Sequence, residues 1–409
     1  MSAKQARLFL RRGRANPLWH GHPWVYSGAI ERTEGTYEPG DLVEVCDIEG
    51  RLIGRGLANA RSQIIVRMLT RREEPLDVDH PGDTSEQALS RLLARRLTEA
   101  ALLRQRLHLP SPETDAYRLC NSEGDGLPGL IVDVYNGVAA VQFTTLGMKR
   151  REGAIYDALL ALPPPYRPRA IIEVSAGGFA RLEGFGSATR LVHGEATMPI
   201  SCREAGVQLE VDPLRGQKTG MFLDQRDNRV AVGRLASGGR VLDVYSYAGG
   251  FALQALRHGA IAATCVDSSS RALERARRHA QLNALCGLEV VEADAFRFLE
   301  SVTPRSFDVV IVDPPKFARA HKDLPAALKG YRRLNALALT AVAPGGLLAT
   351  CSCSQLIGCE DLERVVAGAA LDAARSVTLV QVGSQGPDHP VPAAFPEGRY
   401  LKFLLLGVR

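Results

Sequence analysis

The sequence predicts an α/β protein with a doubly wound parallel sheet in its C-terminal part, behind a small β-rich domain and a central α+β domain. A length of 409 residues is too great for one ordinary hydrophobic core, so two or three domains are expected. From about residue 198, apolar strands alternate with helical patterns, which is the order of parallel β-α-β units. The first 72 residues instead contain short apolar stretches separated by Gly and Pro, a pattern typical of small β domains.

The composition is that of a soluble globular protein, with 45% hydrophobic and 23% charged residues. The net charge of +5 is mildly basic, which permits an RNA partner without requiring one. No apolar run is long enough for a membrane span, and the charged N-terminus does not read as a secretory signal. The 8 cysteines show no zinc-type spacing, so we expect reduced thiols, a cytoplasmic protein and no metal site.

Each predicted domain has its own pattern of elements, and the expected boundaries are 1–75, 76–197 and 198–409. The polar, Pro-containing stretch 75–85 reads as a linker. The central domain is expected to have a helix over 85–108, two strands around the Asn136-Gly137 turn, a helix over 148–162 and a strand over 170–174. The C-terminal strands are expected at 240–244, 263–267, 288–292, 309–312 and 347–351.

The most informative segment is FDVVIVDPPKF at 307–317, an apolar strand that runs directly into Asp-Pro-Pro. Neither proline can donate a backbone hydrogen bond, so the strand ends there in a stiff turn. Asp313 is thereby expected at the carboxyl edge of the sheet, where open α/β folds bind their ligands. The segment favours a group-transfer enzyme.

Three further acidic residues follow successive predicted strands. Asp243 ends a strand before the Gly249-Gly250 turn, Asp267 ends the next strand, and Asp294 follows the third. Glycines at such a turn let a ligand approach the backbone closely, and an acid at the next strand tip suits ribose hydroxyls. The turn has neither the GxGxxG spacing nor a Walker lysine, which disfavours a dinucleotide or triphosphate. Alternatively, the acids cap helices or face solvent.

This arrangement resembles the class I S-adenosylmethionine-dependent methyltransferases, over about residues 200–409. The resemblance implies S-adenosyl-L-methionine as cofactor, with Asp243 and Gly249 near its methionine part, Asp267 near the ribose and Asp294 near the adenine. The segment QKTGMFLDQRDNR at 217–229 resembles the signature of the RlmI-type 23S ribosomal RNA cytosine-5 methyltransferases. The cofactor-binding residues expected from both resemblances are Phe222, Arg226, Asp243, Tyr245, Ser246, Gly249, Asp267, Ser268, Asp294, Ala295 and Asp313.

A second reactive group is expected in LLATCSCSQ at 347–355, which contains Cys351 and Cys353. Alternating residues of an extended segment share a face, so both thiols are expected to point the same way. They are either two small buried side chains or a reactive pair at the sheet edge near Asp313. In the resembling family the SCS triplet carries the nucleophile, which implies Cys353 in this role and leaves Cys351 as the second choice. Asp313 is expected to polarise the target ring, and Lys316 and Phe317 are expected to shape the target pocket; alternatively, Lys316 is a solvated turn residue.

The N-terminal segment LRRGRANPLWHGHPWVYSGAI at 10–30 resembles the start of a PUA domain, a small β-barrel used by RNA-modifying enzymes. Basic side chains are expected to contact phosphates and aromatic side chains to contact bases, although Trp24 alternatively packs in the barrel core.

His389 either lies near the target base or holds a loop in place, and we expect the loop role. The implied partner is 23S ribosomal RNA, and the resemblance hints at a homodimer. The other functions considered are ring-nitrogen methylation of a guanine and a non-catalytic RNA-binding assembly factor. The basic residues at the N-terminus are Lys4, Arg7, Arg11, Arg12 and Arg14.

Overall fold

The computed structural model describes residues 5–74, 76, 84–214, 220–318 and 320–409. Lys4, most of the predicted linker and the residues Gln217, Lys218 and Thr219 lie outside these ranges. The chain divides into two compact units, the first of which comprises Met1–Cys202, Val211–Met221 and Pro387–Gly398. The second comprises Arg203–Glu210, Phe222–Gly386 and Arg399–Arg409. In the described ranges we find no helix with the length and apolar character needed to cross a bilayer.

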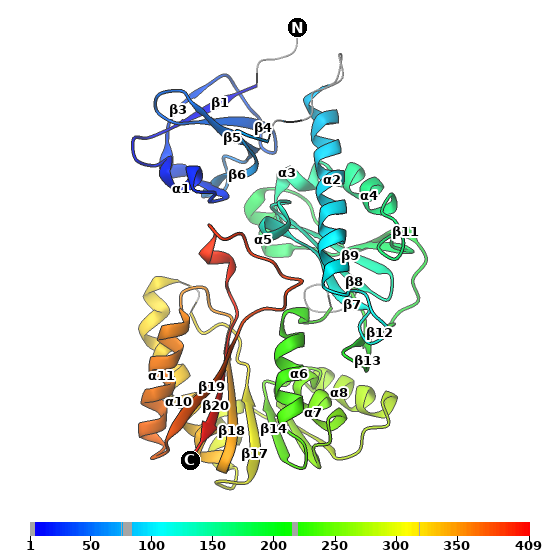
Figure 1. The fold of residues 1–409 in the computed structure, drawn as a ribbon, viewed down its shortest axis with the longest axis vertical. Coiled ribbons are helices and arrows are strands. Elements are labelled where there is room, and N and C mark those ends of the chain that lie inside the picture. The colour runs from blue at the N-terminus through cyan, green and yellow to red at the C-terminus, as the bar shows by residue number, and fades with distance from the viewer. Residues whose placement is uncertain (1–4, 75, 77–83, 215–219, 319) are drawn as a thin grey trace. The chain divides into compact units, whose positions relative to one another are not determined.

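The N-terminal part of the first unit is a six-stranded, mostly antiparallel sheet in the order β2-β6-β5-β4-β1-β3 (Figure 1). Its core consists of apolar residues from alternating strand positions, such as Leu8, Val25 and Val66. The β-rich domain expected from the sequence is thus present. The elements are β1 Arg7–Leu10, α1 Asn16–Trp19, β2 Trp24–Tyr26, β3 Ile30–Glu34, β4 Leu42–Cys46, β5 Leu52–Ala58 and β6 Ile64–Arg71.

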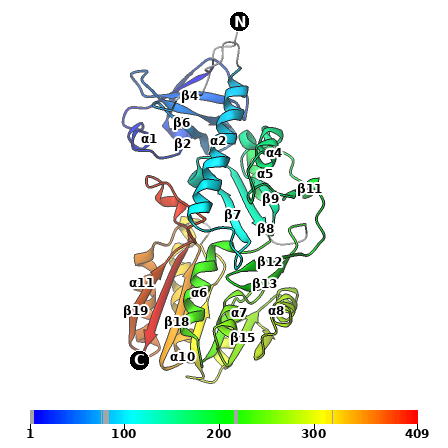
Figure 2. The ribbon, with the colours of Figure 1, turned by 45° about the vertical axis from the view of Figure 1, so that its right-hand side comes forward.

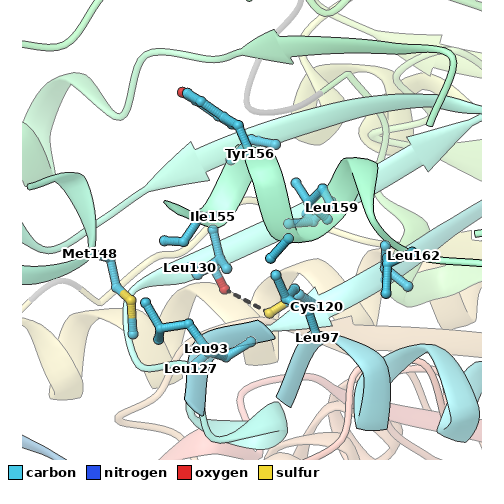
Figure 3. Close-up of a cluster of buried hydrophobic side chains, with 14 of the residues drawn as sticks. Leu93, Leu97, Cys120, Leu127, Leu130, Met148, Ile155, Tyr156, Leu159 and Leu162 are labelled. Carbon is cyan, nitrogen blue, oxygen red and sulfur yellow. Dashed lines mark hydrogen bonds between the residues drawn. The ribbon is translucent and has the colours of Figure 1, made fainter. Parts of the chain in front are cut away.

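The central part is a five-stranded sheet in the order β11-β10-β9-β8-β7, and the long helix α2 packs against it (Figure 2). Thr84 caps α2 in a capping box with Gln87, which fixes where the helix begins. Figure 3 shows leucines of α2 meeting apolar residues of the sheet and of α4. The elements are α2 Ser85–Arg106, β7 Ala116–Asn121, β8 Leu130–Tyr135, β9 Val138–Phe143, α3 Leu146–Lys149, α4 Glu152–Leu160, β10 Ala170–Glu173, α5 Gly177–Glu183 and β11 Arg190–Gly194.

The turn between β8 and β9 is the one expected from the sequence. Asn136 (φ 46°) and Gly137 (φ 73°) both adopt the left-handed conformation that a two-residue hairpin needs. The helix expected over 148–162 is divided, because α3 ends at Lys149 and α4 begins only at Glu152.

The segment Pro387–Gly398 comes late in the chain but belongs to the first unit. The side chain of Asp388 accepts a hydrogen bond from the Arg118 backbone N–H (2.9 Å), and its carbonyl accepts one from Arg104 Nη2 (2.7 Å). Arg104 is fully buried and also pairs with both carboxylate oxygens of Asp125. This arginine therefore ties the segment to α2 and to the turn after β7.

The second unit is built on a seven-stranded sheet in the order β16-β15-β14-β17-β18-β20-β19. The first five of these strands are parallel, and the two C-terminal strands, which the sequence did not predict, are antiparallel. The strands are β14 Arg240–Val244, β15 Ala262–Asp267, β16 Leu288–Glu292, β17 Phe307–Val312, β18 Val342–Ser352, β19 Val377–Gly383 and β20 Lys402–Val408.

Helices cover both faces of this sheet, as in a doubly wound fold. One core lies under α6, α7 and α8, and the other lies under α9, α10 and α11 (Figure 1). A hairpin of β12 Ile200–Glu204 and β13 Val207–Val211 precedes the sheet, and the division between the two units runs through it. The helices are α6 Arg226–Leu235, α7 Gly250–Arg257, α8 Ser270–Leu282, α9 Ala295–Ser301, α10 Leu324–Ala341 and α11 Cys359–Asp372.

The buried arginine of the first unit gives a test of this architecture. Arg104→Met should lower the free energy of unfolding by about 3 kcal/mol, because it leaves the Asp125 carboxylate buried without its counter-charge. Chemical denaturation of the full chain measures this loss. Arg106→Met, an exposed change on the same helix, is the control and should stay near wild type. Equal stability of the two variants would contradict the anchoring role.

Candidate functional site

The candidate site residues of the second unit lie where parallel strands end. Asp267 is the last residue of β15, Asp313 directly follows β17 and Cys353 directly follows β18. Strands β14, β17 and β18 are parallel neighbours, and the Asp313 N–H donates to the carbonyl of Val244 (3.3 Å). These residues therefore share one edge of the sheet, as the sequence predicts for an α/β ligand site.

Asp243 is the most deeply buried acid at this edge, with 1% of its surface exposed. Its Oδ2 accepts a hydrogen bond from the Ala252 N–H (3.1 Å), while its buried Oδ1 has no partner. Burial raises the pKa of Asp243 to about 7, and the nearby charges of Asp313 and Asp267 act in the same direction. A buried carboxylate oxygen without a partner suits a cationic or hydrogen-bond-donating ligand group.

Asp267, the acid at the end of β15, is held by backbone N–H groups. Both carboxylate oxygens of Asp267 accept backbone hydrogen bonds, from Tyr247 and from Ser269 (2.9 Å each). Gly249 has φ 78°, and a Cβ there would lie 3.0 Å from the Cβ of Ala276, so the turn favours glycine. Tyr245 and Tyr247 also have positive φ, which marks the loop after β14 as conformationally strained.

Asp294 fulfils the capping alternative that the sequence left open. It is the N-cap of α9, where its Oδ1 accepts a hydrogen bond from the Arg297 N–H (3.0 Å), and it is exposed. The pKa of Tyr245 is raised to about 12 by burial and by the charges of Asp294 and Asp267. Both acids therefore lie near one aromatic ring. Of the other expected residues, Ser246 and Ala295 are buried and Ser268 is exposed.

The described part of the QKTGMFLDQRDNR segment borders the same loop. The Phe222 ring meets Tyr247 edge-to-face at 5.3 Å, and the Phe222 carbonyl accepts a hydrogen bond from Arg229 Nη2 (2.9 Å). Arg226 is buried, and its Nε donates to Asp227 Oδ1 (3.1 Å). Phe222 thus lies beside the strained loop.

A polar chain that the sequence reasoning missed holds Asp313. The Nε2 of buried Gln225 donates to Asp313 Oδ2 (2.9 Å), and its Oε1 accepts from Asn228 Nδ2 (2.7 Å). Asn228 Nδ2 also donates to the carbonyl of Ser384 (3.1 Å). Because Asn228 fixes which end of the Gln225 amide faces Asp313, the carboxylate has one defined orientation. Gln225 and Asn228 lie within the quoted segment, but side-chain pairing has no signal in the sequence.

The two candidate cysteines have different environments. Cys351 lies within β18 in the core under α6 and α7, with no exposed surface, and burial raises the pKa of its thiol well above the usual range. Cys353 lies one residue beyond the end of the strand and is partly exposed. Cys353 is therefore the more accessible of the two thiols.

The neighbours of Cys353 are also ordered. The Oγ of buried Ser352 donates to the hydroxyl of Tyr331 on α10 (3.1 Å). The ring of Phe317 packs on the ring of Tyr331 at 4.6 Å, whereas Lys316 is exposed. Phe317 therefore supports α10 through a ring contact, in addition to any role in shaping a target pocket.

In the first unit, one of the two candidate RNA-contacting tryptophans is packed against other side chains and the other is exposed. Trp24 packs against Phe395 at 4.5 Å and donates from Nε1 to Glu123 (2.7 Å), whereas Trp19 is 38% exposed. Arg12 and Arg14 are exposed as well.

His389 is buried beside Asp388, which fits the loop role that the sequence favoured. Among the residues with described positions, no group of three or more His, Cys, Asp or Glu is arranged to hold a metal ion.

Two protein-family models match this chain, one in its N-terminal part and one in its C-terminal part. Residues 8–71 match the PUA-like domain family. Residues 182–397 match the S-adenosylmethionine-dependent methyltransferase family. The cofactor of the chain is therefore S-adenosylmethionine, and the unpaired buried oxygen of Asp243 fits its positively charged methionine part.

Curated relatives extend this match to the whole chain. Ribosomal RNA large subunit methyltransferase I of Aeromonas salmonicida is 39% identical over 98% of this chain and 99% of that protein. The protein of the same name from Erwinia tasmaniensis is 38% identical over 97% of this chain and 98% of that protein.

Solved structures share the fold at lower identity. A Streptococcus mutans protein described as a SAM-dependent methyltransferase superposes with a TM-score of 0.81 at 19% identity, covering 98% of this chain and 99% of that chain. A methyltransferase structure complexed with SAH gives a TM-score of 0.80 at 19% identity, with the same coverage. On these grounds the chain belongs to the ribosomal RNA large subunit methyltransferase I family of S-adenosylmethionine-dependent enzymes.

Proposed function

We propose that this protein methylates carbon 5 of a cytosine in 23S ribosomal RNA through a covalent adduct with Cys353. The observation that carries the proposal is the position of Cys353, which is partly exposed just past the end of β18. The neighbouring parallel strand β17 ends in Asp313, and its other neighbour β14 carries Asp243. A nucleophile, a ring-polarising acid and a cofactor-binding acid thus belong to adjacent strand ends.

The chemistry explains why a thiol is needed. Carbon 5 of cytosine is a poor nucleophile, so a thiolate first bonds to carbon 6 and converts the ring into an enamine. Asp313 in its protonated form would donate a hydrogen bond to ring nitrogen 3, which takes up the negative charge that the addition places on the ring. Carbon 5 then takes the methyl group, a base removes the carbon 5 proton, and the thiolate leaves as the ring recovers its double bond. Cys351 does not suit this task, because its fully buried sulfur has a strongly raised pKa.

The remaining site residues would bind the cofactor, which supplies an electrophilic methyl group on its sulfonium. Asp243 would accept hydrogen bonds from the methionine ammonium through its free oxygen. Asp267 would hold the ribose and Asp294 the adenine, with Tyr245 beside both carboxylates. The other proposed cofactor contacts are Phe222, Arg226, Ser246, Gly249, Ser268, Ala295 and Asp313.

The RNA partner is proposed from the relatives and the N-terminal domain together. The relatives are named for the large subunit ribosomal RNA, and the PUA-like domain exposes Trp19, Arg12 and Arg14. Exposed arginines suit phosphates, and an exposed aromatic ring suits an unstacked base. We propose that the activity is cytoplasmic and, from the family resemblance, that the protein forms a homodimer.

Substitution of the two cysteines separates their roles. Cys353→Ala should reduce kcat by at least about a thousandfold, because the adduct cannot form. Cys351→Ala should keep turnover and lose about 1 kcal/mol of stability through the small core cavity. Methylation of ribosomal RNA from a strain lacking the enzyme, mapped by mass spectrometry, measures turnover, and chemical denaturation measures stability.

Trapping of the covalent adduct between Cys353 and the base tests adduct formation independently of turnover. RNA that carries 5-fluorocytosine should form a denaturation-resistant complex with wild type and with Cys351→Ala, but not with Cys353→Ala. Full turnover by Cys353→Ala without any trapped complex would instead favour methylation of a guanine ring nitrogen, and the cytosine proposal would then be abandoned.

The raised pKa of Asp243 predicts pH-dependent cofactor binding. A carboxyl with a pKa of about 7 is mostly protonated at pH 5.5, and the cofactor ammonium favours its ionised form. The affinity for S-adenosylmethionine should therefore rise by about tenfold between pH 5.5 and pH 7.0, below the titration range of the cofactor's own amino group. Calorimetry measures this slope. Asp243→Asn should bind more weakly and with little slope, so equal slopes would refute the assignment.

The polar chain at Asp313 predicts a defect that falls mainly on the chemical step. Gln225→Leu should lower kcat by about tenfold, because the carboxylate loses the donor that orients it. Cofactor affinity should fall much less than kcat, because Asp313 is only one of several proposed cofactor contacts, whereas a merely structural role would weaken binding and turnover to a similar extent. Gln281→Leu, an exposed glutamine on α8, is the matched control. Single-turnover kinetics and calorimetry on the two variants distinguish these cases.

A further inference from the structure

A buried lysine lies beside the proposed nucleophile. Lys402 begins β20 and is the antiparallel partner of Ser352, the last residue of β18. Its Nζ donates a hydrogen bond to the carbonyl of Ser354 and another to the carbonyl of Tyr400 (2.8 Å). Cys353 is the residue between Ser352 and Ser354, so the lysine contacts the backbone on both sides of it.

The ammonium of Lys402 lacks an ordinary counter-charge. Only 7% of the residue is exposed, and no carboxylate in the described ranges forms an ion pair with it. An ammonium has three N–H donors, and two of them are used by the two carbonyls. Burying a charge without a partner is costly, and this burial lowers the pKa of Lys402 to about 8.

The charged and titratable groups that face this lysine identify its missing partner. Cys353 exerts the largest favourable electrostatic effect on the Lys402 ammonium, ahead of Cys359 and Asp361 on α11. Lys316, in the turn after β17, repels it. On α10, a charge on Cys353 would also raise the pKa of Tyr331, after the larger effect of burial.

We propose that Lys402 is a positioning residue whose ammonium serves as the counter-charge of the Cys353 thiolate. The proposal rests on the proposed function, since it gives the nucleophile of that reaction its charged form. A thiolate beside a fixed cation is stabilised relative to the thiol, and this is how reactive cysteines are commonly activated. A lysine in this place also suits the reversal of the reaction, because the thiolate must leave again.

The proton and electron balance of this role is simple. The Cys353 thiol gives its proton to solvent before the substrate binds, and Lys402 stays protonated throughout. The sulfur lone pair forms the bond to carbon 6, and the same electron pair returns to sulfur when that bond breaks. Lys402 therefore donates no proton to the base and touches no reacting carbon.

Alkylation of Cys353 tests the inference without requiring turnover. The rate of its reaction with iodoacetamide, followed peptide by peptide by mass spectrometry, reports the thiolate fraction at each pH. In Lys402→Met the midpoint of this profile should move up by about one pH unit, which is the smallest effect expected of a lost opposite charge nearby. Lys402→Arg should restore most of the wild-type profile because it keeps the charge.

Controls separate this electrostatic role from a structural one. Lys329→Met removes an exposed lysine of α10 and should leave the profile unchanged. Calorimetric binding of SAH to Lys402→Met checks that the fold of the second unit is intact. If Lys402→Met binds SAH normally and its alkylation midpoint matches wild type, the lysine only ties two strands and the inference is overturned. The inference is also overturned if Lys402→Arg behaves like Lys402→Met.

Failure of the proposed function gives a different result. If Cys353→Ala methylates normally while Lys402→Met still shifts the alkylation profile, the pairing of thiolate and lysine is supported and its use in catalysis is refuted. If Cys353→Ala is inactive and the Lys402→Met profile is unshifted, the adduct mechanism stands and the role of Lys402 is refuted.

Discussion

The parallel register of β14, β17 and β18 is the constraint on which the rest of the site depends. Pairing of Val244 with Val312, and of Val312 with Thr350, fixes where each strand ends relative to its neighbours. In a parallel sheet this register sends the residues after each strand to one edge. A slip by one residue would turn Asp243 toward the opposite face. The chemistry therefore depends on ordinary apolar strand packing, which is why the strands are rich in Val, Leu and Ile.

Burial also distinguishes the two candidate cysteines. Cys351 and Cys353 are two residues apart, yet the first contributes to the core under α6 and α7 while the second stands past the end of the strand. The expectation that both share one face assumed that the extended segment continues, whereas β18 ends between them at Ser352. A desolvated thiol resists ionisation, so burial disfavours a thiolate at Cys351.

Strand positions and strand-tip acids could be predicted from the sequence because both follow local rules. Apolar runs gave β14 and β16 at their observed bounds, and the Asn136-Gly137 dipeptide gave the turn after β8. The antiparallel strands β19 and β20 escaped prediction because their order in the sheet depends on tertiary pairing. Gln225 and Lys402 escaped for the same reason: each acts on a residue far away in the sequence, and a buried amide or ammonium carries no local pattern. Asp294 was located correctly, but its role could not be read from the sequence, because helix capping and ligand binding favour the same residue type at the same place.

Two buried groups of the candidate site lie in surroundings that disfavour their charged forms. Burial raises the pKa of Asp243 and lowers that of Lys402, so each is held in an environment that disfavours its charged form. Neither shift contributes to stability: both groups reduce it near neutral pH, where they would be charged if exposed. Destabilising buried groups of this kind are typical of functional sites, where a ligand or a reactive group supplies the missing opposite charge. A cofactor ammonium would do so for the acid, and a thiolate for the lysine. The same desolvation that destabilises the free protein therefore strengthens the two interactions proposed for methyl transfer, since charges attract more strongly where water is excluded.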